Sequence, residues 1–418
     1  MTDQMPETPA PQERPRPEDW ATDWDHTHDD YAAAAPEIWA DLRDRCPVAH
    51  TDRFGGAWLP TRHSDVSAIA HDTDHFSSQS IIVSDFRPSA PAPVGFAPPI
   101  TSDPPFHELA RRLLLPAFSP KAIRPLEAAT RTLCRALIDE MLASGDPLVD
   151  AATAYTQHIP VGVIAHMLGV PPEDGDRFRV FIHRILEKPG QSGPTDTEDT
   201  MISYLQRAIQ DHRDHPRDDL IGYLLGLDLD GEPLDDDHII GTVALLLIAG
   251  IDTTWSAIGA SIWHLAQNPD DRRRLVTEPE LMPNALEEML RAYAPVTMAR
   301  LVSDDIEMGG QHLTRGDWVL LPFPSANRDP EAFDRADEVV LDRTKNRHAA
   351  FGLGIHRCLG SNLARMELRV ALEEWLRRVP DFELSDPGAV RWSTGQVRGP
   401  RCLPLRLLAT VPAEEATG

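Results

Sequence analysis

Cys358 lies at the end of a glycine-punctuated turn, Phe351-Gly-Leu-Gly-Ile-His-Arg-Cys-Leu-Gly360, and a helical pattern begins directly after it. A thiolate at a helix N-terminus is stabilised by the unpaired backbone N–H groups and by the positive end of the helix dipole. Such a sulfur is suited to be a durable metal ligand. The other cysteines, Cys46, Cys134 and Cys402, are scattered without a CxxC pair, which gives no support for a disulfide framework, a zinc site or an iron–sulfur cluster.

The glycines of this turn raise a second interpretation, a nucleotide-binding loop. The dinucleotide fingerprint needs a third glycine three residues after Gly354, where this chain has Arg357. A phosphate-cradling loop needs a following Gly-Lys-Ser/Thr, which the sequence does not have. Both nucleotide interpretations fail, and a metal-binding role for Cys358 is favoured.

An acid and an alcohol interrupt the longest apolar run, in the segment Ala249-Gly-Ile-Asp-Thr-Thr254. Asp252 needs a partner or water there, because burying an unpaired carboxylate is costly. Gly250 weakens a helix, and the Thr253 hydroxyl can bond to a carbonyl one turn back. A helix loosened beside these two groups is a route for water and protons. The structural alternative is a kinked helix with a satisfied threonine.

The turn that ends at Cys358 reads F-x-x-G-x-H-x-C-x-G and resembles the haem-binding loop of the cytochrome P-450 family. Residues 249–254 resemble that family's oxygen-activation segment, A/G-G-x-D/E-T-T, and the resemblance extends over about residues 46–408. It implies heme b (iron protoporphyrin IX), with Cys358 on the iron, where a cysteinate favours O–O cleavage. It also implies that Thr253 supports oxygen activation and Asp252 gates proton delivery. Further haem contacts implied by the resemblance are Ala249, Phe351, Gly354 and Gly360.

Haem carries two propionates, which need cations or hydrogen-bond donors. His107 and Arg111 lie one helical turn apart on the same side, in a stretch that resembles D-P-P-x-H-x-x-x-R of bacterial family members. There, the His and the Arg bind a propionate. By the same resemblance, Arg300 and His356 match further propionate partners. Considered singly, each of the four residues fits an exposed, solvated charge better than a haem ligand. Together, and in register with the two stronger motifs, the four favour propionate binding.

Glu288 and Arg291 place opposite charges three residues apart on one helical face. Such pairs add only about 0.2–0.5 kcal/mol to a helix, and Glu374 and Arg377 have the same spacing. Position favours the first pair, which precedes Cys358 as the E-x-x-R of the P-450 family does. The resemblance implies a buried structural lock completed by a downstream arginine, for which Arg328 or a neighbour is the candidate.

Composition limits the partners and the location. The chain has 418 residues and a net charge of −26, which argues against nucleic acid and against an anionic membrane surface. Residues 1–25 are rich in proline and charge and predict a disordered tail, followed by a single haem domain over 26–418. No apolar run reaches the roughly 20 residues of a membrane span, and no signal peptide is visible, so we expect a cytoplasmic protein.

Helical patterns dominate the sequence, at 121–142, 153–168, 172–186, 200–213, 234–267 and 361–378. Strand patterns are fewer, at 56–60, within 304–321 and within 382–408. The sequence therefore predicts a mainly α chain with a small β portion. The family resemblance implies a single triangular-prism domain, with haem between the long central helix and the helix after Cys358.

The resemblance also implies a substrate pocket built from five separate segments. Their residues are mostly apolar, which predicts a hydrophobic small-molecule substrate. The pocket candidates are Ile81, Ile82, Phe86, Phe96, Phe178, Phe181, Leu245, Val296, Met298 and Val397.

The implied reaction inserts one atom of O2 into the substrate, by hydroxylation, O-dealkylation or epoxidation. Nothing in the sequence indicates a flavin or iron–sulfur site, so a separate ferredoxin and ferredoxin reductase are expected to supply electrons. Four arginines are candidates for docking such a partner: Arg111, Arg112, Arg357 and Arg365. Two alternatives stay open, a peroxide-driven haem peroxygenase and a noncatalytic haem-binding protein.

Overall fold

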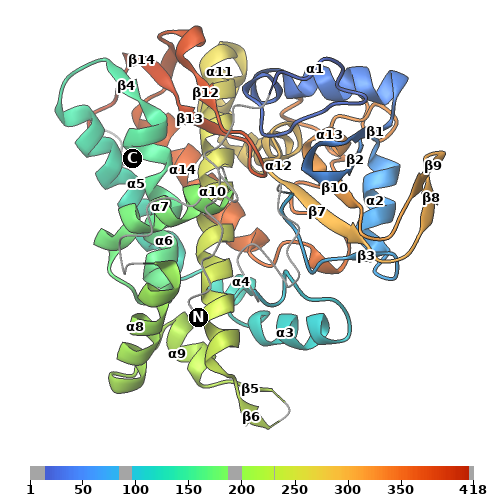
Figure 1. Ribbon diagram of the computed structural model, residues 1–418. Helices are drawn as coiled ribbons and strands as arrows, with labels where there is room; N and C mark the ends of the chain where they lie inside the picture. The colour runs from blue at the N-terminus through green and yellow to red at the C-terminus, as the bar shows by residue number, and fades with distance from the viewer. Residues whose placement is uncertain (1–14, 84–96, 187–199, 230, 414–418) are drawn as a thin grey trace.

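Helix α10 (Asp236–Gln267) runs through the middle of the molecule, with one group of helices on one side of it and a β sheet, accompanied by further helices, on the other (Figure 1). The computed structural model describes residues 15–83, 97–186, 200–229 and 231–413. Asp235 caps the helix by accepting a hydrogen bond from the backbone N–H of His238 at 2.7 Å. By length and composition α10 passes for a membrane-spanning helix, yet 72% of its most apolar window is buried inside the protein. It is therefore a core helix, which is apolar around most of its circumference because neighbours cover it.

The other helices surround α10 or cover the sheet. In chain order they are α1 (Asp29–Arg45), α2 (His63–His71), α3 (Phe106–Leu114), α4 (Pro120–Ile123), α5 (Leu126–Ala143), α6 (His158–Leu168), α7 (Gly175–Leu186), α8 (Met201–Asp214), α9 (Leu220–Leu225), α11 (Pro269–Thr277), α12 (Met282–Ala292), α13 (Phe323–Ala326) and α14 (Ser361–Arg378). α14 contacts α5, α10 and α12, and α6 contacts α10. The helix after Cys358 thus lies against the central helix.

The largest sheet has the strand order β1-β2-β10-β7-β3. β10 pairs in parallel with β2 and antiparallel with β7. The bounds of its strands are β1 (Val48–Thr51), β2 (Ala57–Pro60), β3 (Phe76–Ser77), β7 (Thr297–Val302) and β10 (Trp318–Pro322). This sheet fixes Arg300, whose backbone pairs with that of Val319 in β10.

Smaller sheets complete the β portion. Their strands are β4 (Leu148–Asp150), β5 (Asp228–Leu229), β6 (Glu232–Pro233), β8 (Ile306–Met308), β9 (Gln311–Leu313), β11 (Asp381–Leu384), β12 (Arg391–Trp392), β13 (Pro400–Cys402) and β14 (Pro404–Ala409). β11, β14 and β4 form one sheet, whereas the other strands pair as hairpins, β5 with β6, β8 with β9 and β12 with β13. The expected mainly α architecture with a small β portion is confirmed.

Two sequence expectations need correction. Ala21 and Trp24 are buried in a hydrophobic cluster beneath the sheet, so a disordered tail cannot extend to residue 25. The helix expected at 121–142 is split into α4 and α5, because the chain turns at Arg124 and Pro125. Proline has no backbone N–H to continue a helix, and it stands as the residue before α5 instead.

Candidate active site

The turn before α14 presents Cys358 to a cavity. The backbone N–H of Cys358 donates to the Phe351 carbonyl at 2.7 Å and closes the turn. Gly354 has a φ of +67°, and a Cβ there would lie 1.9 Å from the Ala70 carbonyl oxygen. No other residue fits that position without moving α2, so the glycine allows the turn to press against this helix.

Burial raises the pKa of the Cys358 thiol, while the backbone N–H of Gly360 and the cations of Arg111 and Arg357 act in the opposite direction. The predicted support from the helix start is thus present in the Gly360 hydrogen bond, but the apolar surroundings outweigh it. Metal coordination deprotonates a thiol outright, because the ion supplies a larger local charge than the protein does.

The four candidate propionate partners come together from three different elements. His107 and Arg111 lie on α3, Arg300 on β7 and His356 in the cysteine turn. The rings of His107 and His356 are 4.3 Å apart, and Arg111, Arg300 and His356 line the same cavity as Cys358. These residues form what we call the cationic wall.

Several buried polar atoms of the cationic wall have no hydrogen-bond partner among the residues that the structure describes. Both ring nitrogens of His107 and Nε2 of His356 are buried without a hydrogen bond. Burial, together with the nearby cations Arg300 and Arg111, lowers the pKa of His356 to about 2. Burial lowers the pKa of Arg300 to about 10. Native proteins rarely leave buried polar groups unsatisfied, so this wall has the character of a site for an anionic group.

The acid and the alcohol of α10 have separate surroundings. Thr253 lines the cavity, and its hydroxyl donates to the Ala249 carbonyl at 2.7 Å, as expected. Asp252 is buried and accepts from Arg401 Nη2 at 2.8 and 2.9 Å. The loosened turn expected at Gly250 is not seen, since α10 continues unbroken. A Cβ on Gly250 would lie 3.3 Å from Ile164 Cδ1, so the glycine serves close packing against α6.

The cavity wall beside these groups is apolar, but it contains only some of the predicted pocket residues. Leu245, Val296 and Met298 line it, as do Ala249, Phe351 and Gly360. Phe86 and Phe96 lie outside the described residues. The other five candidates, Ile81, Ile82, Phe178, Phe181 and Val397, are buried but do not line the cavity, and Phe178 packs edge-on against Tyr204. An apolar residue near a pocket segment can equally serve the core, and sequence alone does not separate the two.

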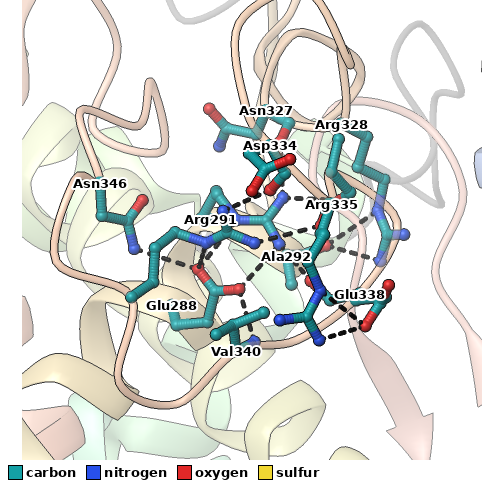
Figure 2. Close-up of polar contacts among 12 residues, drawn as sticks. Glu288, Arg291, Ala292, Asn327, Arg328, Asp334, Arg335, Glu338, Val340 and Asn346 are labelled. Carbon is teal, nitrogen blue, oxygen red and sulfur yellow. Dashed lines mark hydrogen bonds and ion pairs between the residues drawn. The ribbon is translucent and has the colours of Figure 1, made fainter.

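Glu288 and Arg291 form the centre of a buried network (Figure 2). Both side chains are 0% exposed, and two parallel hydrogen bonds of 2.9 Å join them. Glu288 also accepts from the Val340 backbone N–H at 2.8 Å, from Asn346 Nδ2 at 3.1 Å and from Arg343 Nε at 2.9 Å. Burial would raise the pKa of Glu288, but the hydrogen bonds, that of Arg291 foremost, hold it below its usual value.

The network corrects the identity of the downstream arginine. Arg343 binds Glu288, whereas Arg328 donates to the Ala292 carbonyl at 3.0 Å. Arg291 donates its other N–H groups to the carbonyls of Asn327, Ala336 and Glu338. The pair therefore fastens the end of α12 to the segment that leads into the cysteine turn.

Comparison with known proteins places the chain in a family. Residues 191–391 match the family model described as cytochrome P-450. Mycinamicin IV hydroxylase/epoxidase of Micromonospora griseorubida is 34% identical over 377 residues, which are 88% of this chain and 94% of that protein. Nocardicin C N-oxygenase of Nocardia uniformis subsp. tsuyamanensis is 34% identical over 90% of this chain and 95% of its own. The chain belongs to the cytochrome P-450 family.

The fold agrees with solved P-450 structures. The crystal structure of CYP109E1 from Bacillus megaterium in complex with testosterone matches with a TM-score of 0.81 at 30% identity, covering 91% of this chain and 100% of that one. The protein is thus a bacterial-type P-450 monooxygenase, an oxidoreductase, and its family uses haem. The residues present fit that group, because a cysteine sulfur, two arginines, a histidine with an unpartnered buried ring nitrogen and an apolar wall meet at one cavity.

Two features of this P-450 differ from the sequence analysis. Arg365 does not join a free docking group, because it pairs with Glu287 at 2.5 and 2.8 Å and its guanidinium stacks 4.3 Å from the Phe351 ring centre. Arg401, the partner of Asp252, was not among the predicted residues. It lies on β13, far from every motif in the sequence, so no local spacing could indicate it.

Proposed function

We propose that this P-450 binds heme b through Cys358 and inserts one atom of O2 into a hydrophobic small molecule. The observation that supports this best is that a single cavity is lined by Cys358, by Arg111, Arg300 and His356 of the cationic wall, and by Thr253. When bound, the haem iron supplies the binding and reductive activation of O2, and thiolate ligation favours O–O cleavage. Hydroxylation, O-dealkylation and epoxidation are all compatible with such a site.

Different residues of the chain would bind the propionates, hold the substrate and deliver protons. His107, Arg111, Arg300 and His356 would hold the two propionates, since charge-assisted hydrogen bonds satisfy both the carboxylates and the buried donors. Leu245, Val296 and Met298 would exclude water and hold an apolar substrate. Thr253 would present its hydroxyl to the reacting oxygen, and Asp252 would pass protons towards it.

Separate proteins would deliver the electrons, a ferredoxin and its reductase. Arg357 is exposed within the cysteine turn, and Arg112 is exposed on α3 next to Arg111, which donates to the Arg357 carbonyl at 2.5 Å. An acidic partner would meet positive charge at this face despite the net charge of −26. Such a system would operate in the cytoplasm.

The decisive experiment is the absorption spectrum of the reduced, CO-bound protein. We expect a Soret band at the position of thiolate-ligated haem in the wild type and its loss in Cys358→Ala. Cys46→Ala is the matched control, because Cys46 lies at the end of α1, apart from the cavity. A histidine-type band in the wild type, or an unchanged band in Cys358→Ala, would contradict the assignment.

A second experiment separates the monooxygenase from the two alternatives. Mycinamicin IV and testosterone, which appear in the names of similar proteins, are suitable first members of a screen for a low-spin to high-spin shift. The compound with the largest shift is then offered with NADH, ferredoxin and reductase, or with hydrogen peroxide alone. Product with NADH supports our proposal. Product with peroxide only indicates a peroxygenase, and no product with either indicates a haem-binding protein.

A further inference from the structure

Arg401 holds Asp252 through two contacts of one guanidinium nitrogen. Its Nη2 donates to both carboxylate oxygens of Asp252, at 2.8 and 2.9 Å. Its Nη1 donates to the Ser256 hydroxyl at 3.0 Å, and the guanidinium lies 4.2 Å from the ring centre of Trp255. All three partners lie within one and a half turns of α10, so Arg401 is fastened to this short part of the helix.

The backbone of β13 is itself fixed against α10. A Cβ on Gly399 would lie 2.3 Å from Ser256 Cβ, and a Cβ on Gly259 would lie 2.9 Å from Pro400 Cγ. Only glycine at these two positions allows the strand and the helix to approach so closely. The position of Arg401 is therefore determined by backbone packing, in addition to its own side-chain bonds.

The ion pair spans from the protein exterior to a carboxylate beside the cavity. The Arg401 side chain is 15% exposed and the Asp252 side chain 3% exposed. Asp252 is absent from the described cavity wall, although the next residue, Thr253, is part of it.

We propose that Arg401 is a positioning residue for Asp252 and sets the supply of protons to Thr253. The inference rests on the proposed function. Insertion of one oxygen atom into a C–H bond consumes two electrons from NADH and two protons per O2, and the second oxygen atom leaves as water. Arg401 compensates the charge of the buried Asp252 carboxylate and holds it in one place, next to Thr253 in the helix, since an unpaired buried charge neutralises or moves away. When the proton supply is not controlled in this way, O2 takes up the same two electrons and two protons but is released as hydrogen peroxide, and the substrate is not oxidised.

The first test compares product formed per NADH consumed, using the compound with the largest spin shift as the probe. We expect Arg401→Gln to lower this ratio about tenfold, to raise hydrogen peroxide release and to increase the solvent deuterium isotope effect, whereas Arg401→Lys recovers part of the loss. In an Asp252→Asn background, Arg401→Gln should change none of these quantities further. Arg406→Gln is the control, because Arg406 pairs with Glu383 at the exposed surface of β14 and should behave as wild type.

The second test measures the pair without turnover. Thermal unfolding of the haem-loaded protein is followed for Arg401→Gln, Asp252→Asn and the double variant, and we expect the double variant to lose no more stability than the larger single loss. If Arg401→Gln lowers the product formed per NADH, or the melting temperature, by the same amount in the wild type and in Asp252→Asn, the role of Arg401 is overturned. The proposed function would remain intact. Absence of product from the wild type with every electron source would overturn both. If Arg401→Gln does not fold, the same comparison is made with Arg401→Lys.

Discussion

The network around Glu288 and the cationic wall are both buried and charged, but they differ in what completes them. Every oxygen of Glu288 accepts from a neighbouring group, and Arg291 donates to a carboxylate and three carbonyls. In the wall, both nitrogens of His107 and one of His356 have no hydrogen bond from the described protein. One region is complete within the chain, whereas the other requires an added group.

This difference separates a structural role from a binding role more clearly than the residue types do. Both regions contain arginines and buried polar side chains, Glu288 and Arg291 in the network and His107 and Arg300 in the wall. A satisfied buried pair resists substitution because removing one partner strands the other. An unsatisfied buried group costs folding free energy, which is recovered only when its ligand binds.

The largest expected effect comes from breaking the completed region. Glu288→Ala leaves Arg291 and Arg343 without their carboxylate, and we expect a loss of about 3–5 kcal/mol in the free energy of unfolding. Chemical denaturation followed by circular dichroism measures it. Glu278→Ala is the control, since Glu278 lies 3.8 Å from Arg274 in a half-exposed pair. A loss for Glu288→Ala no larger than that for Glu278→Ala would show that the network is not a lock.

The next effect comes from the incomplete region and has a different form. Arg300→Met removes a buried cation with a pKa lowered by burial, so we expect the haem-free protein to lose little or no stability. Haem affinity should fall about 10–100-fold, which corresponds to the loss of one charged hydrogen bond of about 1.5–3 kcal/mol. Transfer of haem to an acceptor protein measures the change.

The matched control for Arg300 is a second arginine with a lowered pKa, Arg398, which lies outside the cavity. Burial also lowers the pKa of Arg398 to about 10, but this side chain donates to the Ala32 carbonyl and lies 4.1 Å from the Trp392 ring centre. Arg398→Met should therefore reduce stability and leave haem affinity unchanged. The comparison fails if Arg300→Met lowers stability without changing haem affinity while Arg398→Met lowers haem affinity.

Sequence reasoning located the parts of the site that short spacing defines. Cys358, Thr253 and the pair of Glu288 and Arg291 lie in motifs whose members are neighbours on one turn or one helix face. Helical spacing placed His107 and Arg111 on one side of their helix, and the family resemblance assigned them to a propionate. Local geometry fixes such groups relative to each other before the chain folds around them.

The remaining parts depend on contacts between distant segments. Arg343 reaches Glu288 only because the chain between 327 and 346 winds around the end of α12, so Arg328 was an equally reasonable candidate from sequence. Arg401 reaches Asp252 because glycines let β13 lie against α10. The sequence analysis assigned apolar residues such as Ile81 and Phe178 to the pocket, but both belong to the hydrophobic core, which favours apolar side chains in the same way as a pocket does. Partner choice across the fold was therefore not predictable from local patterns.

A third prediction uses pH to detect the incomplete region. Burial, reinforced by the neighbouring Arg111 cation, lowers the pKa of His107 in the folded protein below the ordinary 6.5. As the pH falls through about 6.5, His107 binds a proton in the unfolded chain but stays neutral in the folded chain. The stability of the haem-free protein is therefore full above that pH and declines below it, by up to about 1.4 kcal/mol per pH unit for this group. Urea denaturation at pH 7 and pH 5 should show a smaller decline for His107→Gln, and parallel losses in both proteins would contradict the assignment.

The smallest effect is expected where a charged pair is neither buried nor incomplete. Arg406 and Glu383 lie 3.7 Å apart on β14 and β11, with side chains 53% and 52% exposed. Water already solvates both groups, so Arg406→Gln should change stability by less than about 1 kcal/mol and leave haem affinity unchanged. Salt should remove even that difference, because exposed charges are screened. A larger effect, comparable to that of Glu288→Ala, would mean that burial and hydrogen bonding do not decide which charged residues hold this fold together.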